Sequence, residues 1–219
     1  MAELSLRGER RSLRDLAYVT LRDAIVQARL APGERVTEER LSEQLGVSRP
    51  VLREAVQRLQ TEGLLERAGN GRMSVRPATV EDARAHYAVR AALEQLTVEE
   101  AAERLTPEGV ARLDAALGHM RQARDSLAGS VAEGGGEFHQ VLAEIAGNPV
   151  NAELMDMIRA RMDRYRYLSV ATTAQRTEQA VAEHEEILTA LRNGDVEEAK
   201  AVMRRHIAAS EESALQALR

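Results

Sequence analysis

Residues 41–65 read LSEQLGVSRPVLREAVQRLQTEGLL, and this run constrains the fold more than any other part of the chain. Leu41 and Leu45 lie one turn apart on a first short helix, and Gly46 can adopt the left-handed conformation that ends it. Ser48 follows where it can cap a second helix. Two short helices joined by a tight glycine turn are typical of a helix-turn-helix.

The second helix, which begins after Ser48, divides into two faces. Arg49, Arg53 and Gln57 follow one another at intervals of four residues, so they share one polar edge. Arginine can bind a guanine edge or a phosphate through two hydrogen bonds, and glutamine can bind adenine. This pattern predicts a helix that packs on its own domain and reads DNA. The apolar positions predict a buried stripe formed by Leu52, Ala55, Val56 and Leu59.

The segments on either side complete a recognisable order. Residues 13–29 carry apolar positions at helical spacing, and Thr37 is a plausible N-cap for the next helix. Residues 64–67 and 73–76 are short strand-like runs around Gly69-Asn70-Gly71, and Asn-Gly favours a hairpin turn. The alternative is a set of ordinary solvated helices. The order of helices, turn, cap and hairpin favours a winged helix-turn-helix.

The stretch PGERVTEERLSEQLGVSRPVLREAVQRLQTEGLL resembles the N-terminal domain of GntR-family bacterial transcription regulators. That resemblance implies that Arg49 and Arg53 read the major groove and that Gly71, at the tip of the wing, contacts the minor groove or the backbone. Glu39 stands where several members carry a DNA-binding arginine, so this contact is not expected. The candidate DNA-binding residues are Ser48, Arg49, Arg53, Gln57 and Gly71.

Charge and composition agree with this prediction. The chain has 219 residues and a net charge of −5, but residues 1–77 hold 14 basic and 11 acidic side chains, whereas residues 78–219 hold 16 and 24. A mildly basic region joined to an acidic body fits a regulator that binds nucleic acid at one end. The absence of cysteine suits a reducing compartment, and no signal peptide or long apolar span is apparent. We therefore expect a cytoplasmic protein without a membrane partner.

The region after Pro77 is helical in pattern, so we expect a DNA-binding domain over residues 1–77 and an effector-binding domain over residues 78–219. The breaks at Thr106-Pro107, Gly147-Asn148-Pro149 and Asn193-Gly194-Asp195 are ordinary stop and start signals for helices. The fold class is therefore mainly α, a winged helix-turn-helix followed by an all-α bundle. The expected helices cover residues 80–105, 107–127, 133–146, 149–168, 177–191 and 196–218.

Three histidines are the chemically distinctive residues of this bundle. His184 lies in the middle of an apolar helix face, and His206 shares a face with Ala199 and Met203, so both should point inward. His139 follows Phe138 at the edge of another apolar stripe. A buried imidazole needs a hydrogen-bond partner or a metal. From the residues alone, ordinary satisfied core histidines and a shared metal site both remain open.

Four segments, VRAALEQL, EFHQVLAEIAGNP, EHEEILTALRNGDVEEA and MRRHI, resemble the FCD-type effector domain of the FadR subfamily. Many of its members hold a divalent metal with one Asp and three His, and the resemblance maps the three His onto His139, His184 and His206. Gly135 stands where the family has the Asp. Three imidazoles still make an open site for zinc or nickel. The alternative is a metal-free pocket in which the histidines contact an organic ligand.

The candidate effector-binding residues are Arg90 and Asn148. Arg90 could clamp a carboxylate bidentately, or it could simply pair with Glu94 four residues later. Asn148 is also a candidate cap for the next helix, and Tyr165 to Tyr167 are equally consistent with packing and with pocket lining.

Together these features predict a dimeric, DNA-binding transcription regulator controlled by a small organic acid at or near the histidines. Two-fold operators match two-fold proteins, so we expect a homodimer on double-stranded DNA. The alternatives are a regulator that senses the metal itself, and a metal-dependent hydrolase or lyase with a DNA-binding appendage. No nucleophile or general base accompanies the histidines in the sequence, which argues against the enzyme.

Overall fold

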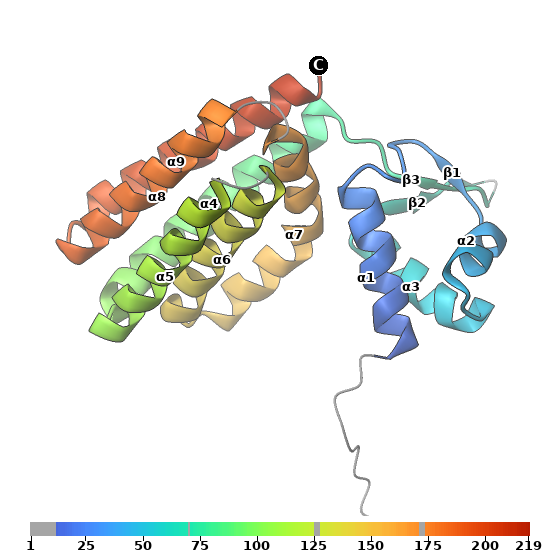
Figure 1. Ribbon diagram of the computed structural model, residues 1–219, viewed down its shortest axis with the longest axis horizontal. Coiled ribbons are helices and arrows are strands. Elements are labelled where there is room, and N and C mark those ends of the chain that lie inside the picture. Colours follow the sequence, from blue (N-terminus) through green and yellow to red (C-terminus); the bar gives the residue numbers. More distant parts are fainter. Residues whose placement is uncertain (1–11, 70, 125–127, 171–173) are drawn as a thin grey trace, which may run out of the picture. The chain divides into compact units, whose positions relative to one another are not determined.

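The computed structural model describes residues 12–69, 71–124, 128–170 and 174–219. The chain divides into two compact units, Met1–Pro77 and Ala78–Arg219. Helices dominate both units, and the strands form one small sheet in the first unit (Figure 1). The fold class is therefore the predicted one, mainly α with an N-terminal helix-turn-helix and a C-terminal helical bundle.

Local signals set the helix starts in the first unit. Ser12 and Asp15 form a capping box at the start of α1, and Thr37 Oγ1 accepts a hydrogen bond from the backbone N–H of Arg40, as predicted for an N-cap. The elements in the described part of this unit are α1 (Leu13–Val26), β1 (Arg35–Val36), α2 (Glu38–Leu45), α3 (Arg49–Thr61), β2 (Leu65–Arg67) and β3 (Met73–Val75).

The turn between α2 and α3 follows the prediction in one part and departs from it in another. Gly46 ends α2 in the left-handed conformation, with φ of 63°. Ser48 occupies the N-cap position of α3, but its side chain makes no capping hydrogen bond, so the expected side-chain cap is absent. Pro50 stands in the first turn of α3 and has no N–H, which removes one of the donors that such a cap would bind.

The predicted hairpin is present and has a third strand beside it. β2 and β3 pair antiparallel, and β1 pairs antiparallel with the other edge of β3, giving the order β1-β3-β2. The sequence did not predict β1, because its two residues are too few to show an alternating pattern. Gly71 has a φ of 79° at the turn of the hairpin, and Asn70 lies outside the described residues.

The second unit is a helical bundle over the ranges expected from the sequence, with one clear difference. The glycine run before Glu137 is part of a helix, which therefore begins at Ala128 rather than Glu133. Glycine weakens helices, but packing of Phe138 and Leu142 in the core outweighs that local preference. The described helices are α4 (Val80–Arg104), α5 (Pro107–Arg124), α6 (Ala128–Ala146), α7 (Pro149–Val170), α8 (Ala174–Arg192) and α9 (Val196–Ala217).

One apolar core runs through this bundle and receives side chains from every one of these helices. Its largest fully buried members include Tyr87 of α4, Leu117 of α5, Phe138 of α6 and Met162 of α7. Arg90, Glu94, His139, His184 and His206 are buried within the same unit although they are polar. These polar groups need partners, and their arrangement forms the second candidate site below.

Across the described ranges, the helices are all too short or too polar to cross a membrane.

Candidate functional site

The polar edge of α3 is exposed in the structure. The side chains of Arg49 and Arg53 are 60% and 66% exposed, and Gln57, one turn further along, is also exposed. The predicted apolar stripe on the opposite face, Leu52, Ala55, Val56 and Leu59, is at most 2% exposed and packs in the first unit. The structure therefore brings the three predicted readers together on one free edge of the helix.

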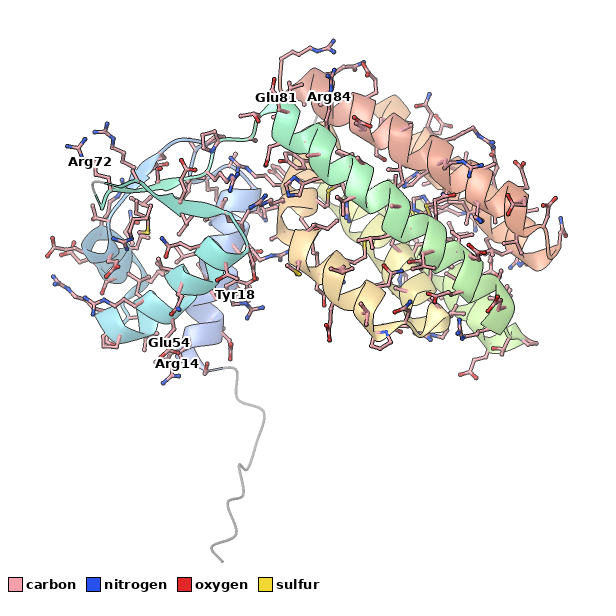
Figure 2. All side chains as sticks on the ribbon, turned by 180° about the vertical axis from the view of Figure 1, so that it is seen from behind. Arg14, Tyr18, Glu54, Arg72, Glu81 and Arg84 are labelled. Atoms are coloured by element: carbon pink, nitrogen blue, oxygen red, sulfur yellow. The ribbon has the colours of Figure 1, made fainter. Side chains whose placement is uncertain are left out.

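Figure 2 draws the described side chains of the first unit and labels Arg14 and Glu54 among them. Arg14 of α1 and Glu54 of α3 form an ion pair of 2.8 Å there. Arg49 and Arg53 each contact a glutamate of α2, and Gly71 accepts a hydrogen bond from Arg67 through its carbonyl oxygen. The DNA-reading candidates are thus held in a network of surface contacts.

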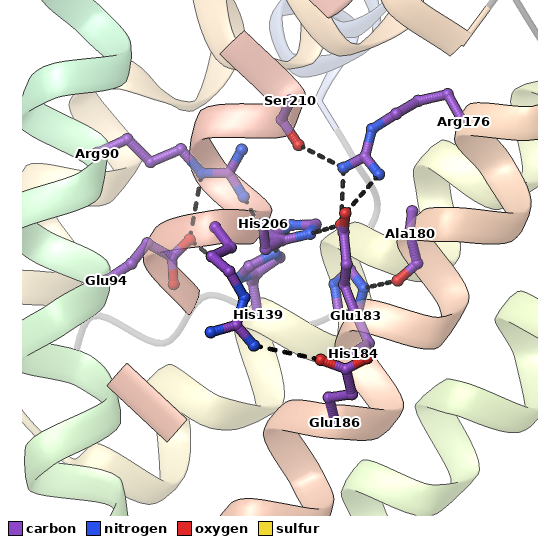
Figure 3. A network of polar contacts seen from close by, with 11 residues as sticks. Arg90, Glu94, His139, Arg176, Ala180, Glu183, His184, Glu186, His206 and Ser210 are labelled. Carbon is purple, nitrogen blue, oxygen red and sulfur yellow. Dashed lines mark hydrogen bonds and ion pairs between the residues drawn. The ribbon is translucent and has the colours of Figure 1, made fainter. Parts of the chain in front are cut away.

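The three histidines predicted as metal ligands come together inside the second unit, from three different helices (Figure 3). His139 of α6, His184 of α8 and His206 of α9 are 9%, 2% and 4% exposed. One nitrogen from each ring lies within 4.8 Å of the other two. Nε2 of His139 and Nε2 of His206 are 3.3 Å apart. Such convergence could not be read from the sequence.

The opposite nitrogen of each ring lies next to an oxygen atom. Nδ1 of His184 donates to the carbonyl oxygen of Ala180 at 2.6 Å, and Nδ1 of His206 is 2.7 Å from Glu183 Oε2. Nδ1 of His139 is 2.9 Å from Glu94 Oε1. The hydrogen bonds orient the rings of His184 and His206 as metal-binding histidines are commonly held, whereas Nδ1 of His139 lies close to Glu94 without a hydrogen bond.

Burial keeps these imidazoles neutral. It lowers the pKa of His184 and of His206 well below the ordinary value, and each is lowered further by neighbouring cluster histidines. Burial also lowers the pKa of His139, although Glu94 opposes the shift. Neutral imidazole is the form that coordinates metals. Within the described structure, Nε2 of His184 is buried and has no hydrogen-bond partner, so its lone pair is available to a metal or to a donor.

Gly135, one turn before His139, is buried, and a Cβ atom added to it would lie 3.7 Å from Met120 Cε. This is an ordinary contact distance, so the backbone leaves room for a side chain at the place where the resemblance expects an Asp. The carboxylates that do lie near the rings, Glu94 and Glu183, are on their Nδ1 sides. The donor set that faces inward is therefore three neutral nitrogens, which suits zinc or nickel.

A cavity of about 270 Å³ lies next to His139, between α4, α6 and α7. Arg90, 4% exposed, lies in its wall. Nε of Arg90 is 3.2 Å from Glu94 Oε1, and Nη2 is 3.0 Å from His139 Nε2. The predicted pairing with Glu94 thus exists together with a place beside both the histidines and the cavity. The other polar residues of the wall are Thr97, Gln140, Glu144, Asp156, Arg159, Asp163 and Arg166.

Asn148, the other effector-binding candidate, is placed elsewhere. Its Oδ1 accepts from the backbone N–H of Asn151, which caps α7, and its Nδ2 donates to both oxygens of Glu100 at 2.9 and 3.0 Å. It does not belong to the described residues that line the cavity. Since its amide is occupied in holding the helix end, the structure gives Asn148 a capping role and we do not carry the effector role further.

Sequence reasoning missed two acidic residues of this site and left open whether residues 165–167 pack in the core or line a pocket. Glu94 and Glu183 contact the cluster, although the spacing of Arg90 and Glu94 had suggested only a pair along one helix. Arg166 lines the cavity: a Cβ atom on Gly136 would come within 2.9 Å of its Nη1, so the absence of a side chain there makes room for the guanidinium. Its neighbour Tyr165 is buried and donates to Asp82, whereas Tyr167 is 38% exposed.

Two family models match the chain, in the same order as the two units. Residues 13–76 match the model described as bacterial regulatory proteins, gntR family, and residues 85–209 match the FCD domain. A regulator from an unstable DNA locus of Streptomyces ambofaciens is 32% identical over 95% of this chain and 86% of its own length. The transcriptional repressor RspR of Escherichia coli is 28% identical over 91% and 87%.

Solved structures give the same result. The E. coli protein McbR/YncC superposes with a TM-score of 0.75 at 25% identity, covering 93% of this chain and 99% of that one. A putative GntR regulator from Rhodococcus sp. RHA1 gives a TM-score of 0.77 at 25% identity, covering 94% and 99%. The two relatives and the Rhodococcus protein are described as transcription regulators, which speaks against the hydrolase or lyase alternative.

Proposed function

This chain belongs to the GntR family of bacterial regulatory proteins and carries a C-terminal FCD domain, and from that premise we propose what controls it. It is a DNA-binding transcription regulator, and its affinity for operator DNA depends on a small carboxylate metabolite. The metabolite binds in the cavity beside the three histidines, which hold a divalent metal. The observation that carries this proposal is the convergence of three buried, neutral imidazoles from separate helices.

The residues present fit a metal ion. His139, His184 and His206 would hold it through the nitrogens that face one another, and the unpartnered Nε2 of His184 would gain a ligand. Three protein ligands leave coordination positions open, and imidazole suits zinc and nickel. When bound, such a cation supplies positions for water or for a carboxylate oxygen. Glu94 and Glu183, which lie next to Nδ1 of His139 and of His206, would stabilise the charge of the bound cation.

Arginine side chains support an acid as the metabolite. Arg90 lies in the wall of the cavity and contacts His139, so its guanidinium is close to any group bound next to the histidines. Arg166, from another helix, lines the same cavity. Guanidinium groups bind carboxylates through paired hydrogen bonds, and a cavity of about 270 Å³ suits a small molecule. The acid would change DNA affinity by binding two arrangements of the dimer with different affinities.

For the DNA-binding unit, we infer that Arg49, Arg53 and Gln57 contact base edges in the major groove. Ser48 lies at the start of the same helix, where its N-terminus favours a phosphate, and Gly71 contacts the backbone or minor groove from the wing. The exposed edge of α3 supports this assignment. Binding to operator DNA also implies a cytoplasmic location.

A homodimer is the form that we propose to bind DNA. Exposed apolar side chains lie on α4 and α7: Val89 and Leu96, which are 49% and 40% exposed, and Val150, Leu154 and Met157, which are 63%, 44% and 68% exposed. These two helices pack against each other, so the side chains can form one apolar patch that a second copy would cover. Sedimentation should find a dimer for the parent protein and a monomer for Leu154→Glu. A parent protein that stays monomeric on DNA would refute this part.

One experiment tests the proposal and separates it from metal sensing. Operator affinity is measured by fluorescence anisotropy without metal, with zinc or nickel, and with each metal plus lactate, succinate or citrate. We expect metal alone to change the affinity little and an acid to change it only when metal is present. An equal response to metal with and without acid would identify a metal-responsive regulator. No response to any of these additions would contradict the proposed control.

A further inference from the structure

Two adjacent glutamates at the start of α2, Glu38 and Glu39, contact the arginines of the DNA-reading helix. They bind different nitrogen atoms of the two guanidinium groups. Glu38 accepts from Nε of Arg53, whereas Glu39 accepts from Nη2 of Arg49. The nitrogens of a guanidinium are not equivalent in recognition, because a guanine edge is usually bound by the outer fork of the side chain. The atom that each glutamate occupies therefore determines how many outer donors of the arginine remain available.

Glu38 binds the inner nitrogen of the Arg53 guanidinium, Nε, and also contacts Arg67 of the wing. Its Oε2 is 3.0 Å from Arg53 Nε, and its Oε1 is 3.0 Å from Nη2 of Arg67 on β2. Arg67 also donates through Nη1 to the carbonyl oxygen of Gly71, at the turn of the hairpin. In the described structure, the terminal nitrogens of Arg53 make no hydrogen bond. One carboxylate thus links α2, α3 and the wing while the outer fork of Arg53 stays available.

Glu39 has the opposite relation to Arg49. Its Oε1 is 2.7 Å from Nη2, one of the two outer nitrogens. The side chains of Arg49 and Glu39 are 60% and 68% exposed, so solvent weakens this pair and DNA could replace it. While it exists, Glu39 occupies one of the outer N–H donors of Arg49 and places a negative charge where a base or a phosphate would bind.

We propose that Glu38 is a positioning residue, which aligns Arg53 and the wing for DNA, and that Glu39 competes with DNA for Arg49. This inference rests on the proposed reading role of these two arginines. It also explains how the domain can carry acidic side chains at its DNA-binding surface. Hydrogen bonding from Arg53 lowers the pKa of Glu38, which keeps its carboxylate ionised for this role.

Charge alone predicts a different result from positioning, which makes the inference testable. Any glutamate near DNA repels phosphates, so neutralising either one should tighten binding if both act only as charges. If Glu38 aligns Arg53, neutralising it should weaken binding despite the loss of a negative charge. The matched pair Glu38→Gln and Glu39→Gln changes the net charge equally at adjacent positions.

The probe is a duplex that the parent protein selects from a pool of random sequences, with an unrelated duplex of equal length as the nonspecific control. At fixed salt, we expect Glu38→Gln to weaken binding to the selected duplex roughly tenfold, because charge-assisted hydrogen bonds to Arg53 and Arg67 are lost. Glu39→Gln should tighten it about threefold, in keeping with a surface ion pair. The loss for Glu38→Gln should be absent on the unrelated duplex.

Double variants test whether each glutamate acts through its arginine. In the Arg53→Ala background, Glu38→Gln should weaken binding by well below tenfold, because only the effect that comes through Arg67 remains. In the Arg49→Ala background, the gain in affinity from Glu39→Gln should shrink to the effect of charge alone. If both glutamine variants tighten binding equally while Arg49→Ala and Arg53→Ala weaken it, the positioning inference is wrong. If the two alanine variants bind as well as the parent protein, the reading role itself fails.

Thermal unfolding of each variant keeps the result interpretable. Should Glu38→Gln lower the melting temperature, Glu38→Asp provides a second test, since it keeps the charge at the start of α2 but shortens the side chain. We expect Glu38→Asp to weaken binding to the selected duplex as well, because a shorter carboxylate cannot reach both Arg53 and Arg67. Parent-like affinity of a folded Glu38→Asp protein would overturn the inference.

Discussion

The two units contain one arginine–glutamate pair each that can be compared directly. Arg53 and Glu38, in the DNA-binding unit, are 66% and 25% exposed, whereas Arg90 and Glu94, beside the histidines, are 4% and 2% exposed. The N–O distances are similar, 3.0 and 3.2 Å. Water screens the first pair, so the loss of one partner costs little free energy of unfolding. The second pair lies in the core, where a charge left without its partner is expensive.

Because of this difference in burial, we expect substitutions in the first unit to change DNA affinity and substitutions in the second unit to change stability. The side chains that we propose to read DNA are exposed and polar, so their loss should change affinity and leave the fold intact. Side chains around the histidines are buried in the core of the bundle, so their loss should change stability and ligand binding together. The same substitution, arginine to alanine, therefore tests the comparison in both places.

The largest effect should come from Arg90→Ala. Removing the guanidinium leaves the buried carboxylate of Glu94 without its ion-pair partner and should lower the free energy of unfolding by about 3–5 kcal/mol. Chemical denaturation in the presence of a chelator measures this, with exposed Arg104 on the same helix as the control position. A loss below about 1 kcal/mol would show that the buried pair behaves like a surface pair, against the comparison.

Arg53→Ala should act on binding alone. We expect a loss of roughly 1–3 kcal/mol in affinity for the selected operator, with the free energy of unfolding changed by less than about 0.5 kcal/mol. Arg49→Ala should behave in the same way. Anisotropy titrations measure the affinity, and Arg84→Ala, an exposed arginine of α4 labelled in Figure 2, serves as the control. Unchanged operator affinity in both variants would remove α3 from the major groove.

The comparison also explains what the sequence could predict. The helix-turn-helix follows from local signals: Gly46 ends a helix, Thr37 caps one, and Leu52 and Leu59 mark the buried face of α3. Each of these signals acts over a few residues, so it can be read from the chain. Ser48 makes no side-chain cap, and Pro50 leaves it one donor fewer to bind, which is also a local effect.

The histidine site depends on contacts between distant segments. Helical spacing could show that His184 and His206 face inward, but not that they meet His139, which is 67 residues before His206. Nor could it show that Glu183 contacts His206 rather than its neighbour along the chain. Such convergence depends on how six helices pack, and the resemblance to a known effector domain was needed to expect it.

Gly135→Asp tests whether a carboxylate at position 135 strengthens metal binding. A carboxylate one turn before His139 would add an anionic oxygen on the same side of α6, and we expect metal to bind about tenfold more tightly. Gly136→Asp is the matched control: its Cβ would meet Arg166 Nη1 at 2.9 Å, whereas the Cβ at Gly135 has room. Melting temperatures without metal must be compared, because both variants replace a glycine within a helix. Equal gains in metal affinity would show that position 135 is not special.

The smallest effect should come from Tyr18→Phe in the DNA-binding unit. The hydroxyl of Tyr18 donates to Glu62 at 2.7 Å, and Arg58 lies over the ring at 3.7 Å. Losing the hydrogen bond should cost about 1 kcal/mol of unfolding free energy at neutral pH.

The same hydroxyl gives a pH dependence of known sign. Burial, followed by the hydrogen bond to Glu62, raises the pKa of Tyr18 from 10.0 to about 12. A group whose pKa is raised by folding stabilises the protein below its unfolded pKa and loses this contribution as the pH rises through the folded value. The difference in stability between parent and Tyr18→Phe should therefore fall between pH 10 and 12. A difference that stays constant over this range would contradict the assignment.

Calorimetric titration of zinc, nickel and manganese into the parent protein and into His184→Ala tests the central claim, that the buried histidines of the effector domain form a metal site. We expect one ion per chain for the parent protein, tighter binding of zinc and nickel than of manganese, and an affinity at least about 100-fold lower for His184→Ala. Native mass spectrometry confirms the stoichiometry. Equal binding to the two proteins, or none to either, would mean that the histidines only line a pocket or fill the core.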